Sequence, residues 1–300
     1  MRLKRIAVAV VVALALVLVG GHVWADSSLR KDIGLSGLPN RPDTGGTNYL
    51  IVGSDSREGL SKEDQKRLRV GYEPTKRADT MMILHADDDG STLVSLPRDS
   101  WVEIPAYRGA ESGKDYPAER NKLNAAYAFG GSGLLAQTVE ANTGLRIHHV
   151  VEVGFAGFEQ VVDAVGGVEI DVPRRIKDKN SGADFQPGVQ TLNGAQALAY
   201  ARQRYQEPEG DLGRTKNQQT VLHALSEAVG PANGLKVANA VFDTVRVDKD
   251  FYPIDLVNMG LALKDAERMN VPVSNPGYHT DKGSTVLWSV YADDLWKKLR

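Results

Sequence analysis

The sequence contains no cysteine, which excludes disulfide bonds, cysteine-ligated zinc and thiol nucleophiles. It has no excess of either charge: 36 basic and 38 acidic residues leave a formal net charge of −2, which excludes a polybasic protein that binds nucleic acid through bulk charge. The motifs G-x-S-x-G and H-E-x-x-H and the Walker lysine are missing, so serine hydrolases, zincins and P-loop proteins have no support. Any anion-binding site must therefore be built locally from dispersed side chains.

The N-terminus carries a basic tail, residues 1–5, followed by an uninterrupted apolar run over residues 6–19. This charge order is typical of an export signal or of an anchor whose short tail stays in the cytoplasm. Extending the run to Trp24 gives 19 residues, close to a bilayer span, whereas residues 23–25 also resemble a cleavage site. We predict a single-pass membrane anchor, or a signal peptide, over 6–24, with the remaining chain on the extracytoplasmic side of the cell membrane.

The remaining composition, 42% hydrophobic and 25% charged, is that of an ordinary globular protein. Residues 25–46 contain proline and glycine but few large apolar side chains, which predicts a linker. The folded domain is accordingly predicted over 47–300, as one unit of roughly 250 residues.

Apolar runs rich in valine, isoleucine, leucine and methionine predict strands at 48–53, 79–86, 91–96, 149–153 and 168–172. Helical periodicity predicts helices at 122–129, 133–142, 156–165, 193–202, 213–229, 235–243 and 254–267. Strands interleaved with helices favour an α/β sandwich, and a hairpin turn at 87–90 favours a mixed sheet. The polar segments 56–76 and 103–120 are interpreted as long loops near the site.

Two short signatures, Asp55-Ser56-Arg57 and Arg77-Ala78-Asp79, place a carboxylate and a guanidinium two residues apart at strand ends. In an extended chain such residues face the same side. Carboxylates bind a hard cation and arginines bind phosphate oxygens, so this combination suits a metal-bridged phosphate. The alternative is that each acid simply neutralises its neighbouring arginine at the surface.

Further arginines follow predicted strands and helices. Arg98 follows the predicted strand at 91–96. The alternative to phosphate binding is a salt bridge of Arg98 to Asp99 or Glu103. Arg202 and Arg204 would point about 200° apart in a helix, so joint contact with one diphosphate requires the helix to end near residue 200 or 201. Arg214 and Gln218 are spaced i, i+4 and share a face in the first turns of a helix, where an anion is favoured.

Other motifs are weaker. Lys122 opens a helical run and could reach a phosphate, although an ordinary exposed helix start explains it nearly as well. Residues 131–136 fit G-x-G-x-x-A but follow a helix rather than a strand, so a dinucleotide site is rejected and a helix cap is preferred. The pair His148-His149 lacks metal-ligand partners at useful spacing, which favours structural roles. The apolar residues Phe155, Phe158, Val161, Val162 and Val165 have helical spacing, and core packing is preferred over a lipid channel.

In chain order, the motifs are N-Y-L-I-V-G-S-D-S-R, R-A-D-T-M-M-I-L-H, V-S-L-P-R-D-S, K-L-N-A-A-Y-A-F-G-G, V-E-V-G-F-A-G-F-E-Q-V-V-D-A-V-G-G-V-E-I-D-V-P and L-N-G-A-Q-A-L-A-Y-A-R-Q-R, followed by G-D-L-G-R. This succession resembles the LytR-CpsA-Psr family over a motif core at 48–225. The resemblance implies a membrane-anchored extracytoplasmic domain with a three-layer α/β/α sandwich and a central mixed β-sheet. It also implies a phosphotransferase that moves a glycopolymer from a polyprenyl diphosphate carrier to peptidoglycan through a phosphodiester link.

The resemblance further implies roles for individual residues. Asp55 and Asp79 would bind Mg²⁺ or Mn²⁺, and Asp79, Arg98 and Arg202 would be catalytic. The substrate contacts that it implies are Arg57, Arg77, Arg98, Arg202, Arg204, Arg214 and Gln218, and we predict Lys122 as a further substrate contact from its position at a helix start. One departure is Asn217, where the family commonly has an arginine before the paired glutamines, which puts head-group affinity or polymer choice in doubt.

Two other functions stay open at this point. A polyprenyl diphosphate phosphohydrolase would use the same residues and pass the phosphoryl group to water. A membrane-anchored regulator would bind the lipid carrier without turnover. The sequence leaves open which glycopolymer is carried.

Overall fold

The structure is a computed structural model that describes residues 26–35, 41–72, 77–203 and 211–300, with side chains from residue 213 onward in the last range. The predicted cytoplasmic tail and anchor, 1–5 and 6–24, lie outside the described residues. Within the part described, no helix combines the length and hydrophobicity needed to cross a bilayer.

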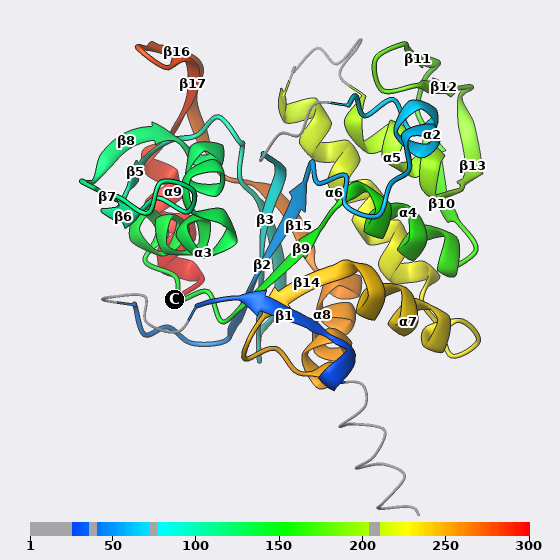
Figure 1. Cartoon of the computed structure of the whole chain (residues 1–300), viewed down its shortest axis with the longest axis horizontal. Coiled ribbons are helices and arrows are strands. Elements are labelled where there is room, and N and C mark those ends of the chain that lie inside the picture. Colours follow the sequence, from blue (N-terminus) through cyan, green and yellow to red (C-terminus); the bar gives the residue numbers. More distant parts are fainter. Residues whose placement is uncertain (1–25, 36–40, 73–76, 204–210) are drawn as a thin grey trace, which may run out of the picture.

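A mixed sheet forms the centre of the molecule (Figure 1). In spatial order its described strands are β1 (Arg30–Ile33), β14 (Val245–Asp248), β9 (His149–Val153), β2 (Thr47–Ser54), β3 (Ala78–Asp87), β4 (Gly90–Ser95) and β15 (Glu267–Asn270). Strands β9 and β2 run parallel, whereas β2, β3 and β4 form an antiparallel meander. The predicted hairpin at 87–90 and the mixed sheet are therefore confirmed.

Helices cover both faces of this sheet because its central strands alternate between two apolar cores. Leu50 and Val52 face a core formed with α3 (Leu123–Thr143) and α9 (Val290–Lys298). Tyr49 and Ile51 face the other core, formed with α4 (Phe155–Ala164), α7 (Gly234–Thr244) and α8 (Pro253–Asp265). Burial on both faces explains why these strands read as continuous apolar runs, and it confirms the α/β/α layering.

A smaller part of the molecule stands beside the α4 face. Helices α5 (Gly194–Arg202) and α6 (Asp211–Ala228) pack there on two antiparallel strand pairs. The pairs are β10 (Val168–Val172) with β13 (Gly188–Leu192), and β11 (Ile176–Asp178) with β12 (Ala183–Phe185). The predicted strand at 168–172 exists, but it pairs with β13 and lies outside the central sheet. Helix α5 ends at Arg202, the end of the predicted helix 193–202, and so continues just beyond residue 201, where joint contact of Arg202 and Arg204 with one diphosphate required it to end.

The predicted helices at 122–129 and 133–142 form α3, which is interrupted where predicted. Gly130 and Gly131 have non-helical backbone angles, and Gly131, with φ 65° and ψ −161°, adopts a conformation essentially restricted to glycine. The same residues belong to the rejected G-x-G-x-x-A motif, and their role here is a kink inside a helix.

Three expectations about loops and linkers were wrong. Arg30–Ile33 lies inside the predicted linker 25–46, yet it is the edge strand β1, with Leu29, Ile33 and Leu35 buried. Its partner β14 is more than 200 residues away in the chain, so no local pattern signals the pairing. The segment 56–76 contains α2 (Lys62–Arg67), and the segment 103–120 contains β-structure.

The strands outside those already named form small antiparallel pairs. They are β5 (Trp101–Ile104) with β8 (Glu119–Lys122), β6 (Tyr107–Arg108) with β7 (Asp115–Tyr116), and β16 (Val273–Thr280) with β17 (Gly283–Trp288).

Candidate functional site

Asp79 occupies a β-bulge between β2 and β3. Gly53 faces Thr80 and Ser54 faces Ala78, so Asp79 is the extra residue on β3. A bulge changes the direction of its extra side chain and is common beside active sites. Asp79 also lines a large cavity formed by described residues. The regular alternation that paired Arg77 with Asp79 in the sequence does not hold across this irregularity.

Arg98 contacts Asp79 directly. Its Nη1 donates to Oδ1 of Asp79 at 2.6 Å, and its Nε lies 3.5 Å from Oδ2 of Asp99. The Nζ of Lys122 lies 3.2 Å from Oδ1 of the same Asp99. Charges therefore alternate along Lys122, Asp99, Arg98 and Asp79. Lys122, predicted as a substrate contact, is separated from Asp79 by an acid and an arginine, and it does not line the large cavity.

Asp55, directly after β2, is buried and holds the chain next to Asp79. Its Oδ1 accepts a hydrogen bond from the backbone N–H of Arg77 at 2.9 Å, and its own N–H donates to the carbonyl of Arg77 at 2.9 Å. The two predicted metal-binding acids thus lie at the same end of the neighbouring strands β2 and β3, since Asp55 contacts Arg77, two positions from Asp79. The side chain of Arg77 is exposed.

A cavity of about 990 Å³ runs between the sheet and helices α4, α5, α6, α7 and α8. One end of it is polar. The charged and amide side chains there include Asp79, Arg202, Arg214 and Gln218. The remaining wall is largely apolar, with side chains such as Ile51, Met82, Val151, Leu222, Leu225 and Val241. The cavity therefore fits an amphiphile with an anionic head and a long apolar tail.

Arg202 and Arg57 both bind main-chain carbonyls of the segment after α2. Nη1 and Nη2 of Arg202 donate to the carbonyls of Leu68 and Arg69 at 3.0 and 3.2 Å, and its guanidinium lies 5.1 Å from the ring centre of Phe155. Arg57 donates from Nη2 to the carbonyl of Val70 at 2.6 Å. Two arginines predicted to bind phosphate, Arg57 and Arg202, therefore contact the same segment, residues 68–70. Their guanidinium N–H groups donate to its carbonyl oxygens. Arg204 lies outside the described residues.

Helix α6 supplies two of the predicted contacts. Arg214 is buried and donates from Nη2 to the carbonyl of Asp79 at 3.3 Å, and Gln218, one turn later, lines the cavity. Gln219 points the other way, donating to Oγ of Ser95 at 2.7 Å. Asn217 is buried and Lys216 is exposed, and neither is among the residues that line the cavity.

A second source of polar groups was not predicted from the sequence. Asp178, Asn180 and Ser181 line the polar end of the cavity from the turn between β11 and β12. Their types are those of an ordinary turn, so no local signal distinguishes them.

Glu152 was also not predicted from the sequence. The available signal was a single charged residue inside the apolar run Val150–Val153. This buried carboxylate accepts hydrogen bonds from the hydroxyls of Tyr127 at 2.8 Å and Ser132 at 2.6 Å and from Nη1 of Arg246 at 3.0 Å. Burial and the nearby carboxylate raise the pKa of Tyr127. Glu152 also borders a smaller cavity of about 290 Å³, which shares Ser54 and Gly154 with the large one.

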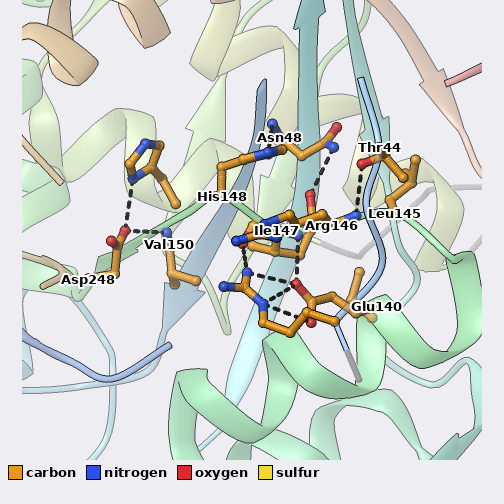
Figure 2. Close-up of polar contacts among 12 residues, drawn as sticks. Thr44, Asn48, Glu140, Leu145, Arg146, Ile147, His148, Val150 and Asp248 are labelled. Atoms are coloured by element: carbon orange, nitrogen blue, oxygen red, sulfur yellow. Dashed lines mark hydrogen bonds and ion pairs between the residues drawn. The ribbon is translucent and has the colours of Figure 1, made fainter. Parts of the chain in front are cut away.

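The histidine pair lies at the opposite end of the sheet, as part of the structural network in Figure 2. Nδ1 of His148 accepts from the backbone N–H of Asn48 at 3.0 Å, and burial, followed by the charge of Arg146, lowers the pKa of His148 to about 4. His149 stacks on Tyr49, and its Nδ1 lies 3.3 Å from Oδ2 of Asp248. The predicted structural roles are confirmed.

Glu140 belongs to the same network (Figure 2). It accepts from the backbone N–H of Ile147 at 2.8 Å and from the guanidinium of Arg41, also at 2.8 Å. This ion pair fixes the end of α3 against the chain that enters β2.

The apolar side chains of α4 serve both of the roles considered from the sequence, core packing and lining of an apolar channel. Phe155, Phe158 and Val161 line the cavity, whereas Val162 is fully buried in the small core and Val165 packs against the same core. One face of α4 therefore forms the cavity wall while its neighbouring face packs.

The donors at the polar end suit a magnesium-type ion better than a transition metal. Among the described residues, no group of three or more histidine, cysteine, aspartate or glutamate side chains gathers as a metal cluster. Magnesium needs only one or two carboxylates and completes its shell with water and phosphate oxygens. A carboxylate has about four acceptor positions, so a contact with Arg98 or with a backbone N–H is compatible with one metal bond.

Fold and cavity together define a class: an α/β/α protein that encloses an apolar channel with a cluster of arginines and aspartates at one end. The sequence pattern of the LytR_cpsA_psr family matches residues 27–294, and the chain belongs to this family.

Its relatives carry names from cell-wall synthesis. It is 38% identical over 306 residues to the probable cell wall biosynthesis protein LcpB of Corynebacterium glutamicum, covering 98% of this chain and 70% of that protein. It is 36% identical over 199 residues to the polyisoprenyl-teichoic acid–peptidoglycan teichoic acid transferase TagU of Enterococcus faecalis, covering 64% of this chain and 60% of that protein. The chain thus spans well under the full length of these relatives.

Among solved structures, the LytR-Csp2A-Psr enzyme from Actinomyces oris superimposes with a TM-score of 0.69 at 20% identity, covering 90% of this chain and 96% of that one. At this identity the likeness establishes the shared fold.

Proposed function

We propose that this protein is a membrane-attached phosphotransferase that moves a glycopolymer from a polyprenyl diphosphate carrier to peptidoglycan outside the cytoplasm. The carrying observation is the cavity of about 990 Å³, polar at the end where Asp79, Arg202, Arg214 and Gln218 meet and apolar beyond it. A polyprenyl diphosphate has the same distribution of properties. Family membership and a relative named as a teichoic acid transferase support the proposal.

The reaction exchanges one phosphoester bond for another. A hydroxyl oxygen of the acceptor attacks the phosphorus that bears the glycan, and the bond from that phosphorus to the bridging oxygen breaks. The bridging oxygen keeps the electron pair and leaves on polyprenyl phosphate, while the hydroxyl proton passes to a base, for which Asp79 is the candidate. Phosphoryl transfer needs mainly alignment and compensation of negative charge, which Arg98, Arg202 and Arg214 supply.

Arg202 must exchange partners when the diphosphate binds. Its Nη atoms are held by the carbonyls of Leu68 and Arg69, at distances normal for hydrogen bonds. Phosphate oxygens are charged and form stronger hydrogen bonds with arginine than neutral carbonyls do. Substrate binding therefore shifts the segment after α2 away from Arg202.

The proposed cofactor is Mg²⁺, or Mn²⁺ in its place, held by Asp55 and Asp79. When bound, the ion would draw charge from the diphosphate oxygens and favour departure of polyprenyl phosphate. The test compares Asp79→Asn with Asp87→Asn, the same chemical change at the other end of β3. Asp79→Asn should abolish magnesium-dependent turnover, and Asp87→Asn should retain it. Equal turnover in the two variants would remove Asp79 from the mechanism.

The activity itself is tested with the full chain, a lipid-linked glycan and peptidoglycan fragments, with magnesium or with EDTA. We expect a joined glycan–peptidoglycan product together with polyprenyl phosphate. Release of the glycan phosphate without a joined product would instead identify a phosphohydrolase, and carrier binding with neither product would identify a regulator.

A further inference from the structure

Helix α8 exposes an apolar stripe although it is packed on the sheet. Ile254, Val257 and Leu261 are 56%, 54% and 63% exposed, and their i, i+3, i+7 spacing places them on one face. Met259 and Leu263 of the same helix are buried in the core. Scattered exposed apolar residues are ordinary, but a contiguous set marks a surface that contacts something apolar.

The stripe continues around an opening of the large cavity. Val257 and Leu261 are exposed and also line that cavity, as does Val229 at the end of α6. Leu235, at the start of α7, is 72% exposed, and its neighbour Gly234 lines the cavity. A channel wall that is both apolar and open to solvent marks the point where an apolar chain can enter. We call Leu235, Ile254, Val257 and Leu261 the α8 rim.

The α8 rim lies near the place where the chain enters the folded part. The ammonium of Lys31 pairs with Asp26, the first described residue, at 2.5 Å and lies 4.5 Å from the ring centre of Tyr252, the N-cap of α8. Figure 1 shows β1, α7 and α8 together in the lower part of the molecule. The segment before Asp26 contains the run that the sequence predicts as a membrane anchor, so an anchored chain would hold this side towards the bilayer.

Charge around the α8 rim argues for apolar contact rather than attraction to anionic lipids. Nζ of Lys264 lies 3.9 Å from Oε2 of Glu227, and the sequence segments that carry the α8 rim contain both signs of charge: Lys236, Lys249, Asp243, Asp250, Asp255 and Asp265. This mixture of positive and negative charges differs from the polybasic clusters that bind acidic headgroups. A stripe of leucine, isoleucine and valine on a helix is suited to insertion at the boundary of headgroups and acyl chains.

We propose that the α8 rim docks on the lipid bilayer and places the cavity opening against the membrane, so that the prenyl chain enters directly from the acyl region. The proposal rests on the proposed function for its substrate, and its test by lipid contact stands apart from activity.

Because the protein has no cysteine, one introduced thiol can be labelled specifically. The full chain carrying Leu235→Cys or Ile254→Cys, each with an environment-sensitive fluorophore, is reconstituted in phosphatidylcholine vesicles that contain brominated acyl chains. The control is Val189→Cys, a position 63% exposed on β13, which lies at a different edge of the molecule (Figure 1).

Labels at 235 and 254 should be quenched, more strongly by bromines near the headgroups than by bromines near the bilayer centre, since interfacial helices insert about 5–10 Å. The label at 189 should stay unquenched. Equal quenching at all three positions, or none at 235 and 254, would overturn the proposal. Loss of solvent exposure at 235 and 254 in detergent, dependent on protein concentration and without lipid quenching, would identify a second copy of the chain as the occupant and would also overturn it.

A second measurement uses Leu235→Glu and Ile254→Glu, which change the α8 rim outside the cavity lining. Transfer from a long-chain carrier in vesicles should fall at least tenfold, while transfer from a short-chain, water-soluble diphosphate should stay unchanged. If the variants transferred from the long-chain carrier at the parental rate, docking of the α8 rim on the bilayer would be contradicted. Absence of transfer from either substrate in the parent protein would instead count against the proposed function.

Discussion

Replacing Arg98 by alanine separates catalysis from stability, because its contact with Asp79 is short but partly exposed to solvent. The Nη1–Oδ1 distance is 2.6 Å, with side-chain exposures of 20% for Arg98 and 39% for Asp79. A pair this accessible contributes about 0–1 kcal/mol to the free energy of unfolding. For a protein of this size that corresponds to a Tm change of at most about 4 °C.

The expected effect on turnover is much larger. An arginine that compensates charge in a phosphoryl-transfer transition state contributes about 10³-fold or more to kcat, which corresponds to about 4 kcal/mol. Arg98→Ala should therefore lose about three orders of magnitude in polyprenyl phosphate release while the protein stays folded. Arg98→Lys keeps the charge but loses the planar pair of donors, so it should recover only part of the rate.

Lys122→Ala provides the matched control, since its ammonium meets Asp99 rather than Asp79. It should remain within about tenfold of the parent rate, the effect of 1.4 kcal/mol. Rates are measured by release of polyprenyl phosphate at saturating carrier, and folding by thermal unfolding of the same preparations. Near-parental activity in Arg98→Ala, or a Tm loss well above about 4 °C, would refute the reasoning.

Three further predictions concern other parts of the molecule. Gly131→Ala should lower the Tm by several degrees, because its backbone conformation costs a non-glycine residue about 1–3 kcal/mol; an unchanged Tm would contradict the kink. The pKa of His148 is lowered from 6.5 to about 4, so between those values the unfolded chain binds a proton that the folded protein does not. The free energy of unfolding should therefore decrease as the pH falls through this range, and His148→Gln should flatten the slope in denaturant titrations; an unaltered slope would exclude His148 as its cause. Gln218→Ala should raise the KM for carrier at constant Tm, whereas Gln219→Ala should lower the Tm, because its Nε2 donates to two acceptors at 2.7 and 2.8 Å; equal Tm losses would remove the distinction.

Local pattern alone located helices α3 to α8 and five of the described strands, β2, β3, β4, β9 and β10. The strands predicted at 48–53 and 149–153 agree closely with β2 and β9 because each is buried on both sides, so its sequence is apolar throughout. The interruption of α3 was also readable, since two consecutive glycines disfavour a helix. The order and spacing of the motifs sufficed to identify the family, because they are properties of the chain itself.

Pairings between distant segments were beyond the reach of local pattern. β1 looked like part of a linker because its four residues carry little apolar surface, and only its parallel register with β14 makes it a strand of the sheet. The cavity is a second example, since its walls come from a sheet and five described helices that converge only in the folded molecule.

The candidate site shows the same division. The sequence determined which charged residues this protein has and that they follow strand and helix ends, because residue type and periodicity are local. Only the tertiary structure decided their partners: a bulge directs Asp79 to the cavity, Arg202 turns to the carbonyls of Leu68 and Arg69, and Lys122 turns to Asp99. The direction of a side chain depends on the groups packed around it, and most of those lie far away in the chain.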